Sequence, residues 1–268
     1  MFVIDVEARQ VRRVLDLAPH RGPHAMAEDP DGKLWITCDD SSEVLVVDPA
    51  TGAVAGVIDM DCHGGHFMCM SLDGSTAYVS NKDTAHLSVI DFASRTIRAR
   101  VPLAEGGEGL CLSPDGTRLL VMSHMGSPLP NEGRPEHLSV YVIDTATLKL
   151  IQQVPLPTLP GIALDADKES RVAISPDGQW VLVSAFRWNS FVVLNAGTLA
   201  IEKTLLVEAE PMNFAWRSDD PAAAYVANHG AGCVSRLSLE TLTVSDRWPS
   251  TPPGCKGRPE DLMFVRSR

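Results

Sequence analysis

The sequence lacks the features that would place it in a membrane or export class at once. No run of apolar residues is long enough to cross a bilayer. The first residues, Met1 to Asp5, fit a β-strand, and no charged segment followed by an apolar one precedes them, so no signal peptide is visible. We therefore expect a cytoplasmic protein, with a leader removed before residue 1 as the alternative.

Positive charge is also in short supply. The 268 residues include 23 Lys and Arg against 34 Asp and Glu, which gives a formal net charge of -11. Neither nucleic acid nor a membrane surface is expected as a partner, because both are commonly polyanionic. The hydrophobic share of 44% and the charged share of 21% are ordinary for a globular protein, and the length suits one large core.

The common catalytic and metal-binding motifs are missing as well. None of the six cysteines belongs to a C-x-x-C pair, which argues against a structural zinc knuckle, although the spacing leaves disulfides open. There is no Gly-x-Ser-x-Gly elbow to present a nucleophilic serine. There is also no Gly-x-Gly-x-x-Gly or Walker loop for a nucleotide.

What the sequence does have is a repeat. The unit is clearest in residues 22–60: an apolar strand enters the turn Pro30-Asp31-Gly32, a second strand and a polar loop follow, and a third strand ends in Asp-Pro-Ala-Thr-Gly before a fourth. The turn aspartate recurs at positions 31, 73, 115, 177 and 219. The alternating strands exclude a solenoid of helix pairs. A period near 42 residues, built from four short strands, is typical of a β-propeller blade.

We predict one all-β domain over residues 1–268, a β-propeller of four-stranded antiparallel blades. Five whole blades are expected near residues 20–60, 61–103, 104–156, 157–207 and 208–250. A strand near 258–265 and two outer strands within 2–17 would join as a composite N-/C-terminal sixth blade that leaves no sheet edge open. A seven-bladed ring is the alternative.

Two insertions lengthen the interval between positions 115 and 177. They cover residues 125–136 and 157–168. Long loops that interrupt a strict repeat usually lie on the binding face, so the 125–136 loop is the expected docking site of a protein partner. A tolerated surface insertion is the alternative.

The repeats resemble the YVTN family of β-propeller proteins. The resemblance rests on strings such as Ser113 to Val121 and Leu138 to Thr147, and on Ala224-Tyr225-Val226-Ala227-Asn228, which nearly contains the family's namesake tetrapeptide. It spans essentially the whole chain and implies the fold, but the family includes lactonase-like proteins, dehydrogenase subunits and surface proteins. The first blade is also similar to the repeat of streptogramin lyase, a propeller that uses magnesium and a histidine to open a cyclic lactone by elimination.

Equivalent positions in the blades define the candidate site. The first strand of each blade lines the central channel, so the starts of these strands face one another. Those positions hold His24, His66, Glu108, Ser170, Met212 and Glu260. The loop after the second strand opens at the same mouth and adds Cys38, Asp39, Asn81, Lys82, His124, Arg187, Asn228 and His229. Glycines precede His24, His66 and Glu108 and leave the backbone there free to approach a ligand closely.

Imidazole and carboxylate groups at one mouth suit a divalent metal ion, which we expect to be Zn, Fe, Mn, Cu or Mg. The predicted ligands are His24, His66 and Glu108. The ion would polarise a carbonyl or activate water, with His124, His229 and Glu260 as the acid–base residues. The residues predicted to contact a small-molecule ligand in the channel are Arg187, Trp188, Asn81 and Asn228. The expected enzyme is a metal-dependent hydrolase or lyase that acts on an ester or lactone.

The alternative hypothesis is a propeller without catalysis, which binds a ligand or a protein partner. Its histidines would be a polar channel lining around water, without any cofactor. It predicts an exposed apolar patch larger than the few hundred Å² that are usual for monomers. The enzyme hypothesis predicts instead that the three ligands approach a common point at about 2.0–2.2 Å each.

Overall fold

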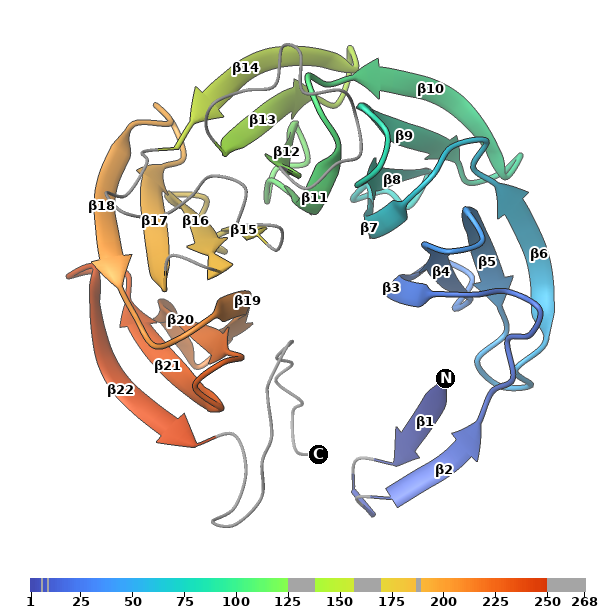
Figure 1. Ribbon diagram of the computed structural model, residues 1–268, viewed down its shortest axis with the longest axis horizontal. Coiled ribbons are helices and arrows are strands. Elements are labelled where there is room, and N and C mark those ends of the chain that lie inside the picture. Colours follow the sequence, from blue (N-terminus) through green and yellow to red (C-terminus); the bar gives the residue numbers. More distant parts are fainter. Residues whose placement is uncertain (6, 9, 125–137, 157–169, 187–188, 250–268) are drawn as a thin grey trace. The chain divides into compact units, whose positions relative to one another are not determined.

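The computed structural model describes residues 1–5, 7–8, 10–124, 138–156, 170–186 and 189–249. Within these ranges the structure is all-β, with 22 strands arranged in six antiparallel sheets (Figure 1). The same ranges contain no helix that is long and apolar enough to span a membrane. The chain divides into two compact units, Met1–Gly107 and Glu108–Arg268.

The first unit contains one two-stranded sheet and two four-stranded sheets. The small sheet pairs β1 (Phe2–Asp5) with β2 (Gln10–Val14). The next sheet consists of β3 (Pro23–Glu28), β4 (Leu34–Cys38), β5 (Glu43–Val47) and β6 (Val54–Asp59). The third consists of β7 (Gly65–Met70), β8 (Thr76–Asn81), β9 (His86–Asp91) and β10 (Thr96–Pro102). In each larger sheet the strands pair in chain order.

The second unit contains three more four-stranded sheets, the first of which starts at the unit boundary. Its strands are β11 (Gly107–Leu112), β12 (Arg118–Ser123), β13 (Ser139–Asp144) and β14 (Lys149–Pro155). The next strands are β15 (Ser170–Ile174), β16 (Trp180–Ala185), β17 (Ser190–Asn195) and β18 (Ile201–Leu206). The last are β19 (Pro211–Arg217), β20 (Asp220–Asn228), β21 (Cys233–Ser238) and β22 (Thr243–Pro249).

Side-chain hydrogen bonds explain why the repeated turns form. Ser113 Oγ donates to Asp115 Oδ1 over 2.5 Å, and the same oxygen accepts the Thr117 amide over 3.1 Å. At the end of β13, Asp144 Oδ1 accepts the Thr147 amide over 2.7 Å. Short polar side chains that bind the backbone two or three residues on favour such turns. At such turns the aspartate therefore helps to set where the neighbouring strands end.

Apolar side chains from neighbouring sheets form the core of each unit. In the first unit, Trp35, Val46, Val79 and Ile90 pack in one cluster, and all four are fully buried. In the second unit, a cluster of buried side chains joins the first two sheets; it includes Leu120, Val142, Val183 and Leu194. Each such side chain stabilises the fold by about 1.5–3 kcal/mol. This packing holds the strand starts in place.

The predicted blades match the structure closely. The five whole blades correspond to the five four-stranded sheets, and β1 and β2 are the two strands predicted near the N-terminus. The six sheets agree with a six-bladed propeller. The predicted closing strand at 258–265 lies outside the described residues, as do the insertions at 125–136 and 157–168. The prediction of a single domain stays a prediction.

Candidate functional site

In the first unit, four polar side chains meet where β3 and β7 begin and where β4 and β8 end. The ring centroids of His24 and His66 are 3.7 Å apart. Nδ1 of His66 lies 2.8 Å from Oδ2 of Asp39, and Nζ of Lys82 lies 2.5 Å from the same oxygen. We call these four residues the His24 cluster.

Two glycines allow the backbone to bring the cluster together. Gly22 and Gly64 have φ angles of +68° and +75°, a conformation that other residues rarely adopt. Their carbonyl oxygens accept the amides of Asp39 and Lys82 over 2.9 and 2.8 Å. A Cβ atom at Gly64 would lie 2.8 Å from the amide nitrogen of Asp83. Both glycines thus allow close packing of the backbone against the loop that carries Asp39 or Lys82, and the expected approach of the backbone to a ligand stays a prediction.

Two members of the cluster are buried and two reach solvent. The side chains of His66 and Asp39 are 8% and 9% exposed, that of Lys82 is 29% exposed, and His24 is exposed. Burial, the largest single influence, raises the pKa of the Asp39 carboxyl, but hydrogen bonds and charge from His66 and Lys82 together hold the pKa below its usual value. Asp39 is therefore ionised near neutral pH. Its Oδ1 atom is buried and accepts no hydrogen bond from the part of the chain that the structure describes.

Three members of the cluster form a group that could hold a metal ion. One ligand atom from each of His24, Asp39 and His66 lies within 4.8 Å of the other two. Two imidazole nitrogens and a carboxylate oxygen suit zinc and other first-row transition ions. With three protein ligands, such an ion would keep positions open for water or substrate.

A second polar group lies within the second unit. The side chain of Glu108, on β11, is 2% exposed, and its Oε1 accepts a hydrogen bond of 2.7 Å from Nη1 of Arg171 on β15. Its Oε2 lies 2.9 Å from Nδ1 of His124, which follows β12, without hydrogen-bond alignment. Gly109 permits this packing, because a Cβ atom there would lie 3.0 Å from Cα of Arg171. The result is a buried carboxylate held between a guanidinium and an imidazole.

The predicted metal ligands are therefore divided between two groups. His24 and His66 come together, and their neighbour is Asp39, which sequence reasoning placed at the channel mouth but did not choose as a ligand. Glu108 is held in the second unit by Arg171 and His124 instead. The useful signal was the position of Asp39 directly after β4, beside the start of the following sheet.

The predicted substrate-contacting asparagines have partners in their own sheets. Nδ2 of Asn81 donates to Ser88 Oγ over 2.9 Å, and Nδ2 of Asn228 donates to Ser235 Oγ over 2.8 Å. Both asparagines are fully buried, so we assign them a structural bond and leave them out of the proposed site. His229 is half-buried and its ring centroid lies 6.2 Å from that of Phe186. Three other predicted site residues lie outside the described ranges: Arg187, Trp188 and Glu260.

The described cysteines form no disulfide bond with one another: Cys38, Cys62, Cys69, Cys111 and Cys233. Burial raises the pKa of Cys38 to about 11 and that of Cys69 to about 12. Both thiols are therefore protonated at neutral pH, and neither is a candidate nucleophile.

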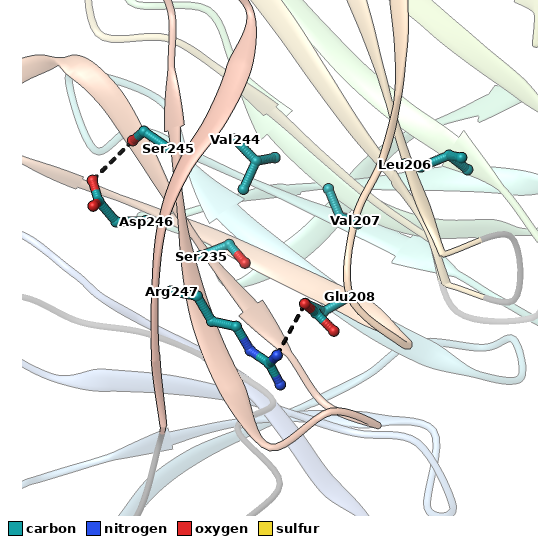
Figure 2. Close-up of a pocket in the computed structure, with 8 residues that line it drawn as sticks. All are labelled: Leu206, Val207, Glu208, Ser235, Val244, Ser245, Asp246 and Arg247. Carbon is teal, nitrogen blue, oxygen red and sulfur yellow. Dashed lines mark hydrogen bonds and ion pairs between the residues drawn. The ribbon is translucent and has the colours of Figure 1, made fainter.

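The second unit also has a pocket of about 320 Å³ near the end of β18 (Figure 2). Arg247 and Glu208 form an ion pair of 3.1 Å across it, with both side chains about half exposed at 53% and 42%. Aliphatic and hydroxyl side chains complete the lining: Leu206, Val207, Val244, Ser235 and Ser245, beside Asp246. No histidine or cysteine is among these lining residues, so the His24 cluster remains the stronger candidate for chemistry.

Comparisons with known proteins show the fold. No family model matches the sequence, and no curated protein matches it. Among solved structures, the chain is similar to hydrazine synthase of Kuenenia stuttgartiensis, with a TM-score of 0.72 at 19% identity over 92% of this chain and 79% of that one. It is also similar to streptogramin B lyase, with a TM-score of 0.69 at 14% identity over 89% of this chain and 72% of that one.

A third similar structure is a functionally unknown protein from Desulfotomaculum acetoxidans DSM 771. Its TM-score is 0.65 at 14% identity, over 80% of this chain and 65% of that one. Sequence identities this low indicate a shared fold and do not transfer the roles of individual residues. The chain is thus a β-propeller with a group of two histidines and an aspartate that could hold a metal ion.

Proposed function

We propose that this propeller is a small-molecule enzyme that binds a divalent metal ion at His24, His66 and Asp39. The reaction class is hydrolysis or elimination at an ester- or lactone-like bond. The observation that carries the proposal is the convergence of the three donor groups within 4.8 Å, beside a buried Asp39 oxygen that accepts no hydrogen bond from the described residues. An ionised oxygen without a partner is costly to bury, and a metal ion would satisfy it.

Two of the three donors, Nδ1 of His66 and Oδ2 of Asp39, already lie at hydrogen-bond distance, 2.8 Å apart. Ligand atoms on one tetrahedral ion, at about 2.1 Å each, lie about 3.4 Å apart. An ion would therefore replace this hydrogen bond after the two side chains move apart by about half an ångström. Bound there, it would polarise a carbonyl or activate water.

The similarity to streptogramin B lyase supports a lyase only as a class, since 14% identity transfers no residues. Within the cluster, exposed His24 is the ligand that a small molecule would meet first. Phe67 lies against both imidazoles, with ring centroids 4.9 Å from each. Its apolar ring gives an organic substrate a surface beside the ion.

Calorimetric titration with zinc and manganese tests the proposal. The parent protein should bind one ion, and His66→Gln and Asp39→Asn should each weaken binding at least about tenfold, the size of effect that loss of a ligand or its partner produces. His20→Gln is the matched control, because Nδ1 of His20 also pairs with a carboxylate, that of Glu43 at 2.7 Å, in the same unit and outside the cluster. It should bind like the parent.

Activity follows from the same variants. A panel of esters and lactones should be turned over by the metal-loaded parent and by His20→Gln, and not by Asp39→Asn. If the parent binds no ion, the proposal fails. The function left standing would then be the metal-free propeller that binds a ligand or a protein partner.

A further inference from the structure

Lys82 is the one member of the His24 cluster that cannot bind a metal ion, because a charged ammonium group has no lone pair to donate. Yet its Nζ lies 2.5 Å from Oδ2 of Asp39, the carboxylate of the proposed metal group. An ammonium and a metal ion attached to one carboxylate repel each other, and the repulsion is strong where water is scarce. Asp39 is only 9% exposed, so water screens the two cations little.

The Lys82 side chain is placed to leave. Its backbone is fixed, since its amide donates to the Gly64 carbonyl over 2.8 Å and its carbonyl packs against Gly106, where a Cβ atom would lie 2.0 Å away. The ammonium instead sits at the end of a flexible four-carbon stem and is 29% exposed. Rotation about side-chain bonds alone can therefore take it into water, without a change of fold.

We propose that Lys82 is an internal cation that pairs with Asp39 when no metal ion is bound and that an incoming ion must displace. This inference rests on the proposed function and adds the control of metal affinity and selectivity to it. In the absence of an ion, the ammonium spares Asp39 the cost of an unpaired buried charge. In its presence, the same pairing lowers the affinity of the site.

Competition at the carboxylate also selects among ions. Magnesium and calcium depend on oxygen ligands and would have to share the one carboxylate of the group, that of Asp39, with Lys82. Zinc and similar ions keep the two imidazole nitrogens of His24 and His66. The site should therefore favour nitrogen-binding ions for as long as Lys82 is present.

The test is calorimetric titration of the parent, Lys82→Met and Lys82→Arg with zinc and with magnesium. We expect Lys82→Met to bind zinc at least about tenfold more tightly than the parent and to narrow the preference for zinc over magnesium. Lys82→Arg keeps a cation on Asp39 and should stay near the parent value. Lys33→Met is the matched control, because Lys33 also pairs with a carboxylate at 2.5 Å, that of Asp48, in the same unit.

The outcomes separate the two proposals. Zinc binding in the parent with equal or weaker binding in folded Lys82→Met overturns the role of Lys82 and leaves the metal site standing. Absence of binding in the parent and in every variant overturns both. Circular dichroism checks that each variant is folded, and a misfolded Lys82→Met is replaced by Lys82→Gln, for which the same expectations hold.

Discussion

The buried ion pair in the second unit makes the sharpest test of how this fold is held together. Glu108 and Arg171 are 2% and 4% exposed in their side chains, with 2.7 Å between Oε1 and Nη1. Glu108→Gln keeps the size of the side chain and one oxygen, but it removes the negative charge. The guanidinium of Arg171 would then stay buried after the loss of the Glu108 charge. Removing one member of such a pair costs about 3–5 kcal/mol.

Since the amide oxygen of Gln still accepts a hydrogen bond, we expect the lower end, a loss of about 3 kcal/mol in the free energy of unfolding. For a domain of this size that is a fall of about 6–12 °C in Tm. Urea denaturation followed by circular dichroism measures the loss. The double variant Glu108→Gln/Arg171→Met should recover part of this loss, because the buried cation that Glu108 neutralises is also removed. A loss below about 1 kcal/mol, or strictly additive effects in the double variant, would refute the reasoning.

Two further perturbations follow from the geometry. Gly64→Ala should destabilise the fold more than Gly32→Ala, although both glycines have φ above +70°. A Cβ atom at Gly64 would lie 2.8 Å from a backbone nitrogen, whereas a Cβ atom at Gly32 would lie 3.8 Å from a side-chain oxygen. Urea denaturation compares the free energies of unfolding of the two variants, and equal losses would contradict this reasoning. Hydrogen bonds from Arg236 and Tyr225 lower the pKa of Asp220 to about 2, so its contribution to stability is complete above about pH 4 and is lost as pH falls towards 2. When the free energy of unfolding is measured from about pH 5 to about pH 2, it should fall less in Asp220→Asn than in the parent. An unchanged pH profile would show that Asp220 does not contribute to the acid loss of stability.

The fold could be predicted from the sequence because turn chemistry and strand length act locally. The aspartates at 73, 115 and 177 each accept hydrogen bonds from a serine two residues earlier in the structure. This contact forms between residues close in sequence and does not depend on the rest of the molecule, so each recurrence of the motif predicts another hairpin. The first sheet differs, since Asp29 rather than Asp31 accepts the turn amides, yet it has the four strands that the repeat predicts.

The site was predicted less completely, because partner choice depends on which loop of one sheet reaches the next. Equivalent positions gave His66 and Asp39 as neighbours of the channel mouth, but not as a pair. The asparagines show a signal that could have been used. Asn81 and Asn228 each have a serine seven residues on, and this spacing closes a hydrogen bond within one sheet. The hydrogen bond within its own sheet explains why such a polar residue is buried, so no ligand is needed to explain it.

Each of the two polar groups pairs an imidazole with a carboxylate, but the two side chains come from opposite places in the sheet. In the first unit the imidazole of His66 is on a strand and the carboxylate of Asp39 is in a loop, whereas in the second the carboxylate of Glu108 is on a strand and the imidazole of His124 is in a loop. Each carboxylate also holds a cation. The cations differ in exposure, 29% for Lys82 against 4% for Arg171.

That difference decides which group can exchange its cation for a metal ion. Lys82 can leave along its flexible stem, whereas Arg171 would have to pass out of a fully packed interior while it keeps a charge that cannot be lost. Only the first group, moreover, offers a second imidazole, that of His24. Glu108→Gln should therefore lower stability and leave zinc affinity unchanged, while Asp39→Asn should weaken zinc binding at least about tenfold at a smaller loss of stability. The reverse pattern would move the metal site to the second unit.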